Sequence, residues 1–125
     1  MNQLKNPQRL DIYMADLPDV GGSIQNGYRP VIIIQNDIGN ANSTTLIVVP
    51  LTSKQKRNMP THVYIESGGG LRKQSVALCE QIMTISKSWL CHYVSTIEDK
   101  ETIDKLHQAI KVSLGMGGAL KDSPM

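Results

Sequence analysis

The sequence predicts a mainly β fold with one helix: a small, strongly curved antiparallel β-barrel with a C-terminal helix packed against it. Three observations support this fold class. Short apolar runs rich in β-branched residues follow one another closely, as in small barrels. After Asp99 the apolar residues recur every three or four positions, as in an amphipathic helix. The chain has 125 residues, which suits one domain and is too short for two, so we expect a single domain over 1–125.

The first part of the chain predicts two strands joined by a long loop. Residues 10–14 alternate weakly between apolar and polar side chains, which is a weak strand signal. Residues 16–29 contain Pro18 and three glycines without an apolar period, so they predict a loop whose length is typical of functional loops. Residues 31–34 are a continuous β-branched run, which predicts a buried strand, and residues 36–40 predict the turn that closes it.

Three more strands are expected before the helix. Residues 44–51 predict one strand, in which Pro50 indicates a sheet edge or a strand end. Residues 61–65 predict the next strand. Residues 75–85 predict a long apolar strand that is interrupted by a polar pair at 80–81.

The helix is expected between two recognisable end signals. Asp99 suits the N-cap, and Gly115 suits the position just after the last turn. The intervening length of about sixteen residues corresponds to roughly 24 Å. Residues 1–8 are polar and 116–125 are rich in glycine, so we expect both ends of the chain to be loose.

Composition excludes some classes of function without selecting one. The formal net charge of +2, with +3 on residues 1–97, argues neither for nor against a nucleic-acid ligand. Phe is absent and one Trp is present, so a platform of stacked aromatic rings is not expected. Cys79 and Cys91 lie in apolar stretches, and we expect buried free thiols in the reducing cytoplasm. No signal peptide and no apolar run of about 18 residues is present, so no membrane association is expected.

No metal site, cofactor or common catalytic motif is predicted. The three histidines are scattered and occur in no metal-binding spacing. His107 adjoins the apolar stripe of the expected helix, where a packed or surface histidine is the more common case. The glycines belong to no phosphate-binding loop, nucleophile elbow or dinucleotide fingerprint.

Polar residues at the ends of the expected strands form the candidate site. Arg29 precedes one buried strand, Thr52 and Ser53 follow another, and Gln81 interrupts a third. Where such strands pair, these residues converge, and an arginine fork beside a threonine hydroxyl suits a phosphodiester. A surface arginine before a proline and a simple turn hydroxyl explain the same spacing, so spacing alone leaves both interpretations open.

Four short motifs over residues 9–115 occur in the order and spacing of a known family. They are Gly27-Tyr28-Arg29-Pro30, Gln35-Asn36-Asp37, Pro60-Thr61-His62-Val63 and Glu80-Gln81-Ile82. On these motifs the chain resembles the MazF/PemK-type toxin endoribonucleases, also called mRNA interferases. The resemblance implies an SH3-like barrel with a C-terminal helix, a homodimer, and metal-independent, ribosome-independent cleavage of single-stranded RNA at a short sequence. It also implies a cognate antitoxin, whose complex with the toxin binds DNA.

The resemblance carries catalytic roles onto two residues. Arg29 matches the catalytic arginine of the family's GxRP motif, and Thr52 matches the catalytic threonine after the third strand. In such enzymes the ribose 2′-OH attacks the adjacent phosphorus and the 5′-oxygen leaves. Arginine is a poor base at neutral pH, which favours charge stabilisation as the main role of Arg29. His62 is a weaker candidate for a base, because its motif is interpreted as structural.

Four residues are expected to bind RNA. Ser23, Gln25 and Gln81 match positions that line the family's RNA groove, where amides and hydroxyls read base edges, and Ser53 joins them. Many relatives carry Glu where this chain has Ile24, so we expect a different recognised sequence.

Two further features bear on the site. Leu10 stands where relatives often have Gly. Lys54, Lys56 and Arg57 flank the proposed site, where they either steer the RNA backbone or form a solvated turn.

Two other functions stay open. Gyrase-poisoning toxins resemble this fold, and they inhibit a protein target without cutting RNA, so they have no need of Arg29 with Thr52. A degenerate relative would bind RNA without cleaving it. The presence of both catalytic positions argues against that second alternative.

Overall fold

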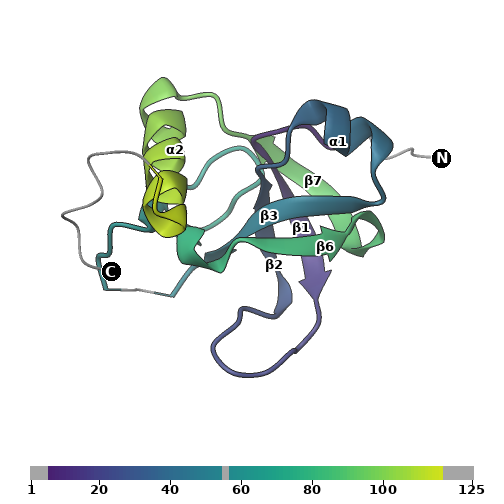
Figure 1. Cartoon of the computed structure of the whole chain (residues 1–125), viewed down its shortest axis with the longest axis horizontal. Coiled ribbons are helices and arrows are strands. Elements are labelled where there is room, and N and C mark those ends of the chain that lie inside the picture. Colours follow the sequence, from purple (N-terminus) through teal and green to yellow (C-terminus); the bar gives the residue numbers. More distant parts are fainter. Residues whose placement is uncertain (1–5, 55–56, 117–125) are drawn as a thin grey trace.

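The computed structural model describes residues 6–54 and 57–116 of the chain (Figure 1). This part contains seven strands, two α-helices and two short 3-10 turns. The strands are β1 (Asp11–Leu17), β2 (Gly27–Ile33), β3 (Thr45–Thr52), β4 (His62–Ile65), β5 (Ser75–Leu78), β6 (Met83–Ser86) and β7 (Leu90–Thr96). The helices are α1 (Asp37–Asn42) and α2 (Lys100–Leu114), and the 3-10 turns are η1 (Cys79–Gln81) and η2 (Lys87–Trp89).

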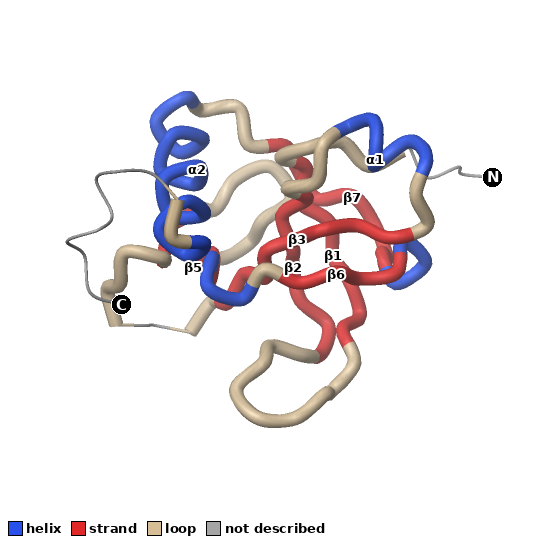
Figure 2. Tube along the Cα trace, in the orientation of Figure 1, coloured by secondary structure: helices blue, strands red, loops and turns tan. Residues whose placement is uncertain are grey.

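The strands form one antiparallel sheet in the order β4-β5-β3-β2-β1-β7, and β6 also pairs with β3. Figure 2 shows the sheet as a small, curved body, with α2 beside it and the β1–β2 loop projecting away. The predicted mainly β fold with a C-terminal helix is confirmed. Within the described residues no strand pair joins the end strands β4 and β7, so closure into a barrel stays a prediction.

Both faces of the central strands are buried, which explains their continuous apolar runs. On β2, Ile32 belongs to one hydrophobic cluster, whereas Val31 and Ile33 belong to the other. On β3, Val49 and Val48 divide in the same way. Successive side chains of a strand point to opposite faces, so an unbroken β-branched run fits a strand that is covered on both sides.

Helix α2 closes the first of these clusters and has the predicted ends. Asp99 is the N-cap, and its carboxylate accepts from the backbone N–H of Thr102 (2.9 Å). Gly115 has a φ of +69°, the left-handed conformation that ends many helices. Leu106 and Ala109 are buried against the sheet. The apolar period therefore identified this helix, and its buried face only in part: Ile103 and Ile110 pack partly buried against the same cluster, whereas Leu114 is 57% exposed.

Pro50 lies where the sheet tolerates a residue without an N–H. One edge of β3 pairs with β6 over residues 45–48 and with β5 over residues 51–52, so Pro50 has no strand partner on that edge. On the other edge it pairs with Val31 of β2. The sequence predicts a sheet edge or strand end here, and the structure shows a gap between two partner strands.

Two loop predictions were wrong in detail. Residues 36–40 form most of the short helix α1 where a turn was expected, because Asn36 caps it by accepting from the N–H of Gly39 (2.8 Å). The loop expected over 16–29 is shorter, because β1 and β2 stay paired as far as Leu17 and Gly27.

Strand β7 is absent from the sequence prediction. Leu90 is its only buried residue, so it lacks the apolar alternation of a half-buried strand. It lies at the end of the strand order and pairs with β1 through two register shifts, which break up any regular pattern.

The two cysteines differ, and the prediction of two buried thiols was wrong for one of them. Cys79 is buried, and burial raises the pKa of its thiol to about 12. Cys91 is exposed, because the edge strand β7 leaves this position uncovered.

The ends of the chain are described only in part. Residues 1–5 and 117–125, on which the prediction of loose ends mainly falls, lie outside the described residues. Pro7 is buried and the N–H of Gln8 donates to Asp11 (2.8 Å), so these two residues are ordered against β1. None of the helices in the described ranges has the length and apolar character needed to cross a membrane.

Candidate functional site

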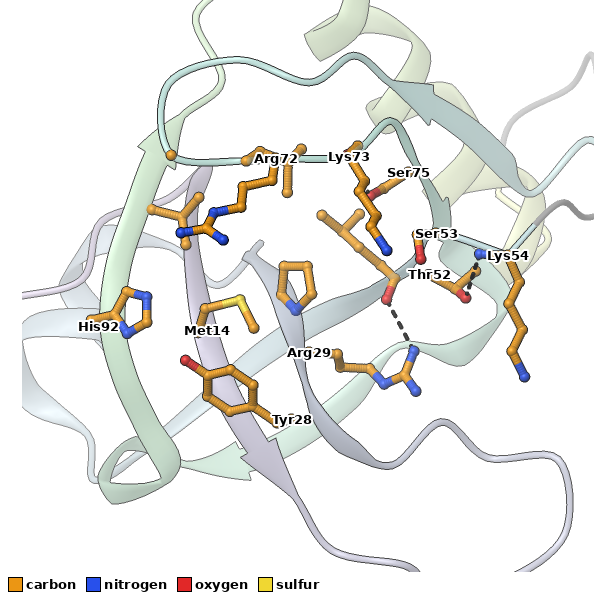
Figure 3. A pocket seen from close by; sticks show the side chains of 15 residues that line it. Met14, Tyr28, Arg29, Thr52, Ser53, Lys54, Arg72, Lys73, Ser75 and His92 are labelled. Atoms are coloured by element: carbon orange, nitrogen blue, oxygen red, sulfur yellow. Dashed lines mark hydrogen bonds between the residues drawn. The ribbon is translucent and has the colours of Figure 1, made fainter.

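A groove of about 620 Å³ opens where β2 begins and β3 ends (Figure 3). Val31 of β2 pairs with Pro50 of β3. Arg29 stands two residues before this pair and Thr52 two residues after it, and both line the groove together with Ser53. The structure therefore brings these three predicted residues together.

Arg29 is held from two sides. Its Nε donates to the carbonyl oxygen of Asn26 (2.6 Å), and its Nη1 donates to the carbonyl oxygen of Leu51 (3.3 Å). A guanidinium has five N–H groups, so these two bonds leave three for a ligand. Burial lowers the pKa of Arg29, but an arginine starts from so high a value that it stays charged at neutral pH. Arg29 thus offers a positioned positive charge to the groove.

Thr52 offers a hydroxyl beside this charge. The residue is 4% exposed, and its Oγ1 accepts from the backbone N–H of Lys54 (3.2 Å). A hydroxyl that accepts one hydrogen bond still has its own proton to donate. Ser53 is exposed and follows Thr52 at the rim of the groove.

Three more cations line the groove, namely Lys54, Arg72 and Lys73, and no Asp or Glu is among the described residues that line it. Figure 3 shows Arg72 and Lys73 reaching into the groove from the side opposite Arg29. Sequence reasoning missed both residues, because they lie in the loop between β4 and β5 and no local pattern tells which surface that loop covers. Neighbouring positive charges without carboxylates favour an anionic ligand.

An aromatic pair lies at the far end of the groove from Thr52. The rings of Tyr28 and His92 have centroids 6.4 Å apart and an interplanar angle of 49°. Met14 lies beside them (Figure 3). Sequence reasoning missed these residues as well. Tyr28 directly precedes Arg29 in the sequence, and this is the one signal that could have indicated part of this surface.

The remaining predicted site residues meet at the base of the β1–β2 loop. Gln81 Nε2 donates to the carbonyl oxygen of Ser23 (3.0 Å), and Gln81 Oε1 accepts from the N–H of Gln25 (2.8 Å). One side chain thus fixes the loop backbone at two points. These residues do not line the groove, but Asn26, next in the loop, accepts from Arg29 and connects the two groups.

His62 has no free ring nitrogen for proton transfer. Its Nδ1 contacts the carbonyl oxygen of Arg57 (2.8 Å) and its Nε2 contacts a carboxylate oxygen of Glu80 (3.1 Å). Burial raises the pKa of Glu80, and hydrogen bonds from its own backbone, His62 and Thr61 outweigh this effect, so the net pKa lies below the usual value. The arrangement is typical of a structural network and agrees with the interpretation of this motif.

The other flagged polar residues lie elsewhere. His107 Nε2 contacts Nη1 of Arg9 (3.0 Å), so it is a partly buried packing histidine. Lys56 lies outside the described residues, and Arg57 is exposed. Within residues 6–54 and 57–116, no group of three or more His, Cys, Asp or Glu side chains is arranged to hold a metal ion.

Leu10 adopts a backbone conformation that suits glycine. Its φ is +77°, the only positive φ at a described residue other than glycine. Its N–H donates to the carbonyl oxygen of Ile33 (2.7 Å), and its own carbonyl accepts from Ile97 (3.0 Å), so the position is fixed by the sheet. The left-handed conformation costs a leucine roughly 1–2 kcal/mol. A glycine would adopt this conformation without that cost.

Curated relatives are similar over almost the whole folded part. The chain is 46% identical over 111 residues to endoribonuclease EndoA of Bacillus subtilis, an alignment that covers 87% of this chain and 95% of the relative. It is 47% identical over 111 residues to endoribonuclease MazF of Staphylococcus saprophyticus, covering 87% and 92%.

Solved structures share the fold. MazF of Deinococcus radiodurans superposes with a TM-score of 0.77 at 18% identity, covering 90% of this chain and 99% of that chain. A mycobacterial endoribonuclease, solved in complex with its cognate antitoxin, superposes with a TM-score of 0.72 at 25% identity, covering 90% and 98%. A family model, described as the PemK-like, MazF-like toxin of type II toxin–antitoxin systems, matches residues 8–114. The chain therefore belongs to the PemK-like, MazF-like toxin family of type II toxin–antitoxin systems.

Proposed function

We propose that this chain is a sequence-specific endoribonuclease toxin that cleaves single-stranded mRNA, independently of the ribosome, in the groove at Arg29 and Thr52. The observation that carries the proposal is the groove itself. It presents an arginine with three unengaged N–H groups beside a buried threonine hydroxyl, among further cations. Relatives at 46% and 47% identity are named endoribonucleases, which supports this reaction class.

The proposed reaction is an internal transesterification. The ribose 2′-oxygen forms a bond to phosphorus while the bond from phosphorus to the 5′-oxygen breaks. The 2′-OH gives up a proton and the leaving 5′-oxygen takes one up, so the products end in a 2′,3′-cyclic phosphate and a 5′-hydroxyl. Negative charge grows on the non-bridging oxygens, and donors aimed at that charge stabilise the transition state.

We assign the stabilisation of those oxygens to Arg29 and Thr52. The guanidinium donates charge-assisted hydrogen bonds from a fixed fork, and the Thr52 hydroxyl donates to a second oxygen. Loss of one such donor typically lowers a rate about 10²–10³-fold. These roles need no metal ion, so we propose metal-independent cleavage.

Base recognition is assigned to the β1–β2 loop. Ser23, Gln25 and Gln81 meet at its base, and Ile24 is 47% exposed within it. An exposed apolar side chain cannot accept from an exocyclic amine, so the recognised sequence should differ from that of relatives with an acid at this position. Ser53, exposed beside Thr52, completes the proposed binding residues.

The proposal includes two partners. A mycobacterial structural relative was solved with its cognate antitoxin, and MazE–MazF complexes of Deinococcus radiodurans share the fold. We propose that this chain acts as a homodimer in the cytoplasm and is inhibited by an antitoxin that covers the same groove. Light scattering of the pure protein should give twice the mass of the 13.8 kDa chain, and a monomer would contradict the dimer.

Cleavage is tested by digesting a long, mixed-sequence single-stranded RNA in excess EDTA. The wild type, Arg29→Gln and Thr52→Val are compared, and the 5′ ends of the fragments are mapped with and without prior treatment by a polynucleotide kinase. We expect only the wild type to cut, at one short recurring sequence, and its fragments to be ligated only after kinase treatment. Absence of both cutting and RNA binding by the wild type would overturn the proposal and point to a protein target such as gyrase.

A further inference from the structure

We propose that Arg72 and Lys73 form a second phosphate-binding element, which holds the RNA backbone next to the phosphate being cut. The inference rests on the proposed ribonuclease function and adds a binding site to it. Both residues line the groove that contains Arg29 and Thr52. They reach it from the opposite wall (Figure 3), on the loop that joins β4 to β5.

The charges of this element are not used by the fold. Arg72 and Lys73 are exposed, and neither side chain forms a hydrogen bond or ion pair with another described residue. By contrast, Lys100 and Lys105 pair with acids one helical turn away on α2. With no carboxylate among the described lining residues, the cations in this groove repel one another until an anion binds.

The backbone that carries the element is fixed on both sides. Before it, Gly68 and Leu71 exchange two backbone hydrogen bonds (2.9 and 2.8 Å), and Gly70 N–H donates to the carbonyl oxygen of Val94 (3.2 Å). After it, the Ser75 hydroxyl donates to the carbonyl oxygen of Lys73 (3.1 Å). The backbone of Arg72 and Lys73 therefore has a defined position on the groove wall, although their side chains form no hydrogen bond or ion pair with a described residue.

Glycine is required for this placement. A Cβ on Gly70 would lie 2.7 Å from the carbonyl oxygen of Val94, and a Cβ on Gly69 would lie 2.8 Å from Cβ of Ser95. Real Cβ atoms do not approach other atoms so closely. Only glycines let this segment lie directly on β7, where it brings the next two residues to the groove.

The position predicts a role in binding and not in the chemical step. Arg29 and Thr52 act on the phosphate whose charge changes during the reaction. A neighbouring phosphate keeps the same charge throughout, so a contact to it stabilises substrate and transition state equally. Loss of Arg72 and Lys73 should therefore raise KM and leave kcat nearly unchanged. A general phosphate contact should also lower affinity for all sequences alike.

The test compares wild type, the double variant Arg72→Gln/Lys73→Gln and the control Lys105→Gln, a cation on α2 outside this groove. The probe is a fluorescent single-stranded 2′-O-methyl RNA dodecamer pool of random sequence, which keeps the backbone and lacks the attacking hydroxyl. Affinity is measured over a series of KCl concentrations. We expect the slope of log K against log[KCl] to shrink by about 0.7 per lost contact, and affinity near 0.1 M salt to fall about fivefold per contact.

The outcomes separate this inference from the proposed function. The wild type and variants are also assayed for RNA cleavage in EDTA, and the double variant should show a raised KM with its kcat retained. Unchanged slope and KM in the double variant, with a wild type that cleaves RNA, would overturn the inference alone. If the antitoxin, and not RNA, loses affinity for the double variant, the element binds an acidic peptide and the inference is again overturned.

Discussion

Two grooves of nearly equal size, about 620 and 590 Å³, lie on either side of the segment 68–71, and their charges are opposite. Four Lys and Arg side chains line the first groove among the described residues. The second lies between the β4–β5 loop, the end of β7 and the start of α2, and Lys105 is its one cation among the described lining residues. Its acids are Glu66, Glu98, Asp99 and Glu101.

The grooves differ also in what their charged groups contact. In the acidic groove Asp99 caps α2 and Glu101 pairs with Lys105 (3.1 Å), so these charges serve the helix. In the basic groove Arg72 and Lys73 have no such partner in the described part of the chain. Cavity size therefore does not distinguish the two grooves, whereas the sign of their charges does: the charges of the basic groove favour an anionic ligand, and those of the acidic groove do not.

The largest effect is expected at Arg29. Arg29→Gln removes the fixed charge from the basic groove, and cleavage should fall by about 10²–10³-fold. Lys105→Gln removes a charge from the acidic groove and should leave the rate unchanged. The measurement is the initial rate of cleavage of the mapped RNA sequence by each variant. Thermal unfolding of the same variants shows whether a lost rate comes from lost stability. Equal losses in both variants would contradict the distinction between the grooves.

A backbone change in the dividing segment should affect both stability and binding. Gly70→Ala places a Cβ 2.7 Å from the Val94 carbonyl oxygen and should lower the free energy of unfolding by about 1–3 kcal/mol. RNA affinity should fall as well, because Arg72 and Lys73 shift with the segment. Gly115→Ala is the control, because Gly115 lies at the end of α2, outside the basic groove and the β1–β2 loop: its Cβ meets no atom within 4 Å, so only the strain of its positive φ applies, about 1–2 kcal/mol. Denaturant unfolding and RNA titration check this, and unchanged RNA affinity in Gly70→Ala would argue against a fixed segment.

Asp99 tests whether the acids of the second groove serve the fold. Hydrogen bonds from the side chain and backbone of Thr102 lower the pKa of Asp99. Its contribution to stability is therefore full above the unfolded pKa of an aspartate, about 3.9, and is lost as the pH falls through the lowered folded value. Asn caps helices as well as Asp, so Asp99→Asn should match the wild type near pH 7 and lose less stability on acidification. Thermal unfolding over pH, with Asp16→Asn as control, tests this, and equal acid sensitivity of variant and wild type would refute it.

The smallest effect on RNA binding is expected from removing negative charges of the acidic groove. Glu98→Gln combined with Glu66→Gln should change RNA affinity by less than about twofold at moderate salt, because these exposed side chains lie outside the basic groove and are screened over about 10 Å. Titration of the double variant with the 2′-O-methyl RNA pool checks this. A large gain or loss of affinity would mean that RNA crosses the acidic groove.

The sequence was informative where local pattern and structure coincide. The runs around Ile32 and Val49 predicted the central strands because both faces of these strands are buried. The end signals Asp99 and Gly115 predicted α2 because capping is a local interaction. Arg29 and Thr52 were predicted to lie close together because each is near the end of a predicted strand, and both line one groove because β2 and β3 pair there.

The rest depends on contacts between distant segments. Arg72 and Lys73 reach the groove because Gly70 packs on Val94, and no pattern near residue 70 names that partner. That Gln81 binds RNA stays a prediction; its amide holds the backbone of Gln25 and Ser23, 56 and 58 residues away along the chain, and no pattern near residue 81 names these partners. These relations are properties of the folded chain and not of local sequence.

Photo-crosslinking tests directly whether RNA binds in the basic groove. A 2′-O-methyl RNA pool that carries 4-thiouridine is bound to the wild type and irradiated, and the modified peptides are identified by mass spectrometry. If RNA binds there, we expect cross-links in peptides that contain Tyr28, Thr52, Lys73 or His92, which all line the basic groove. Cross-links confined to peptides with Glu66 or Glu98, on the acidic groove, would contradict it.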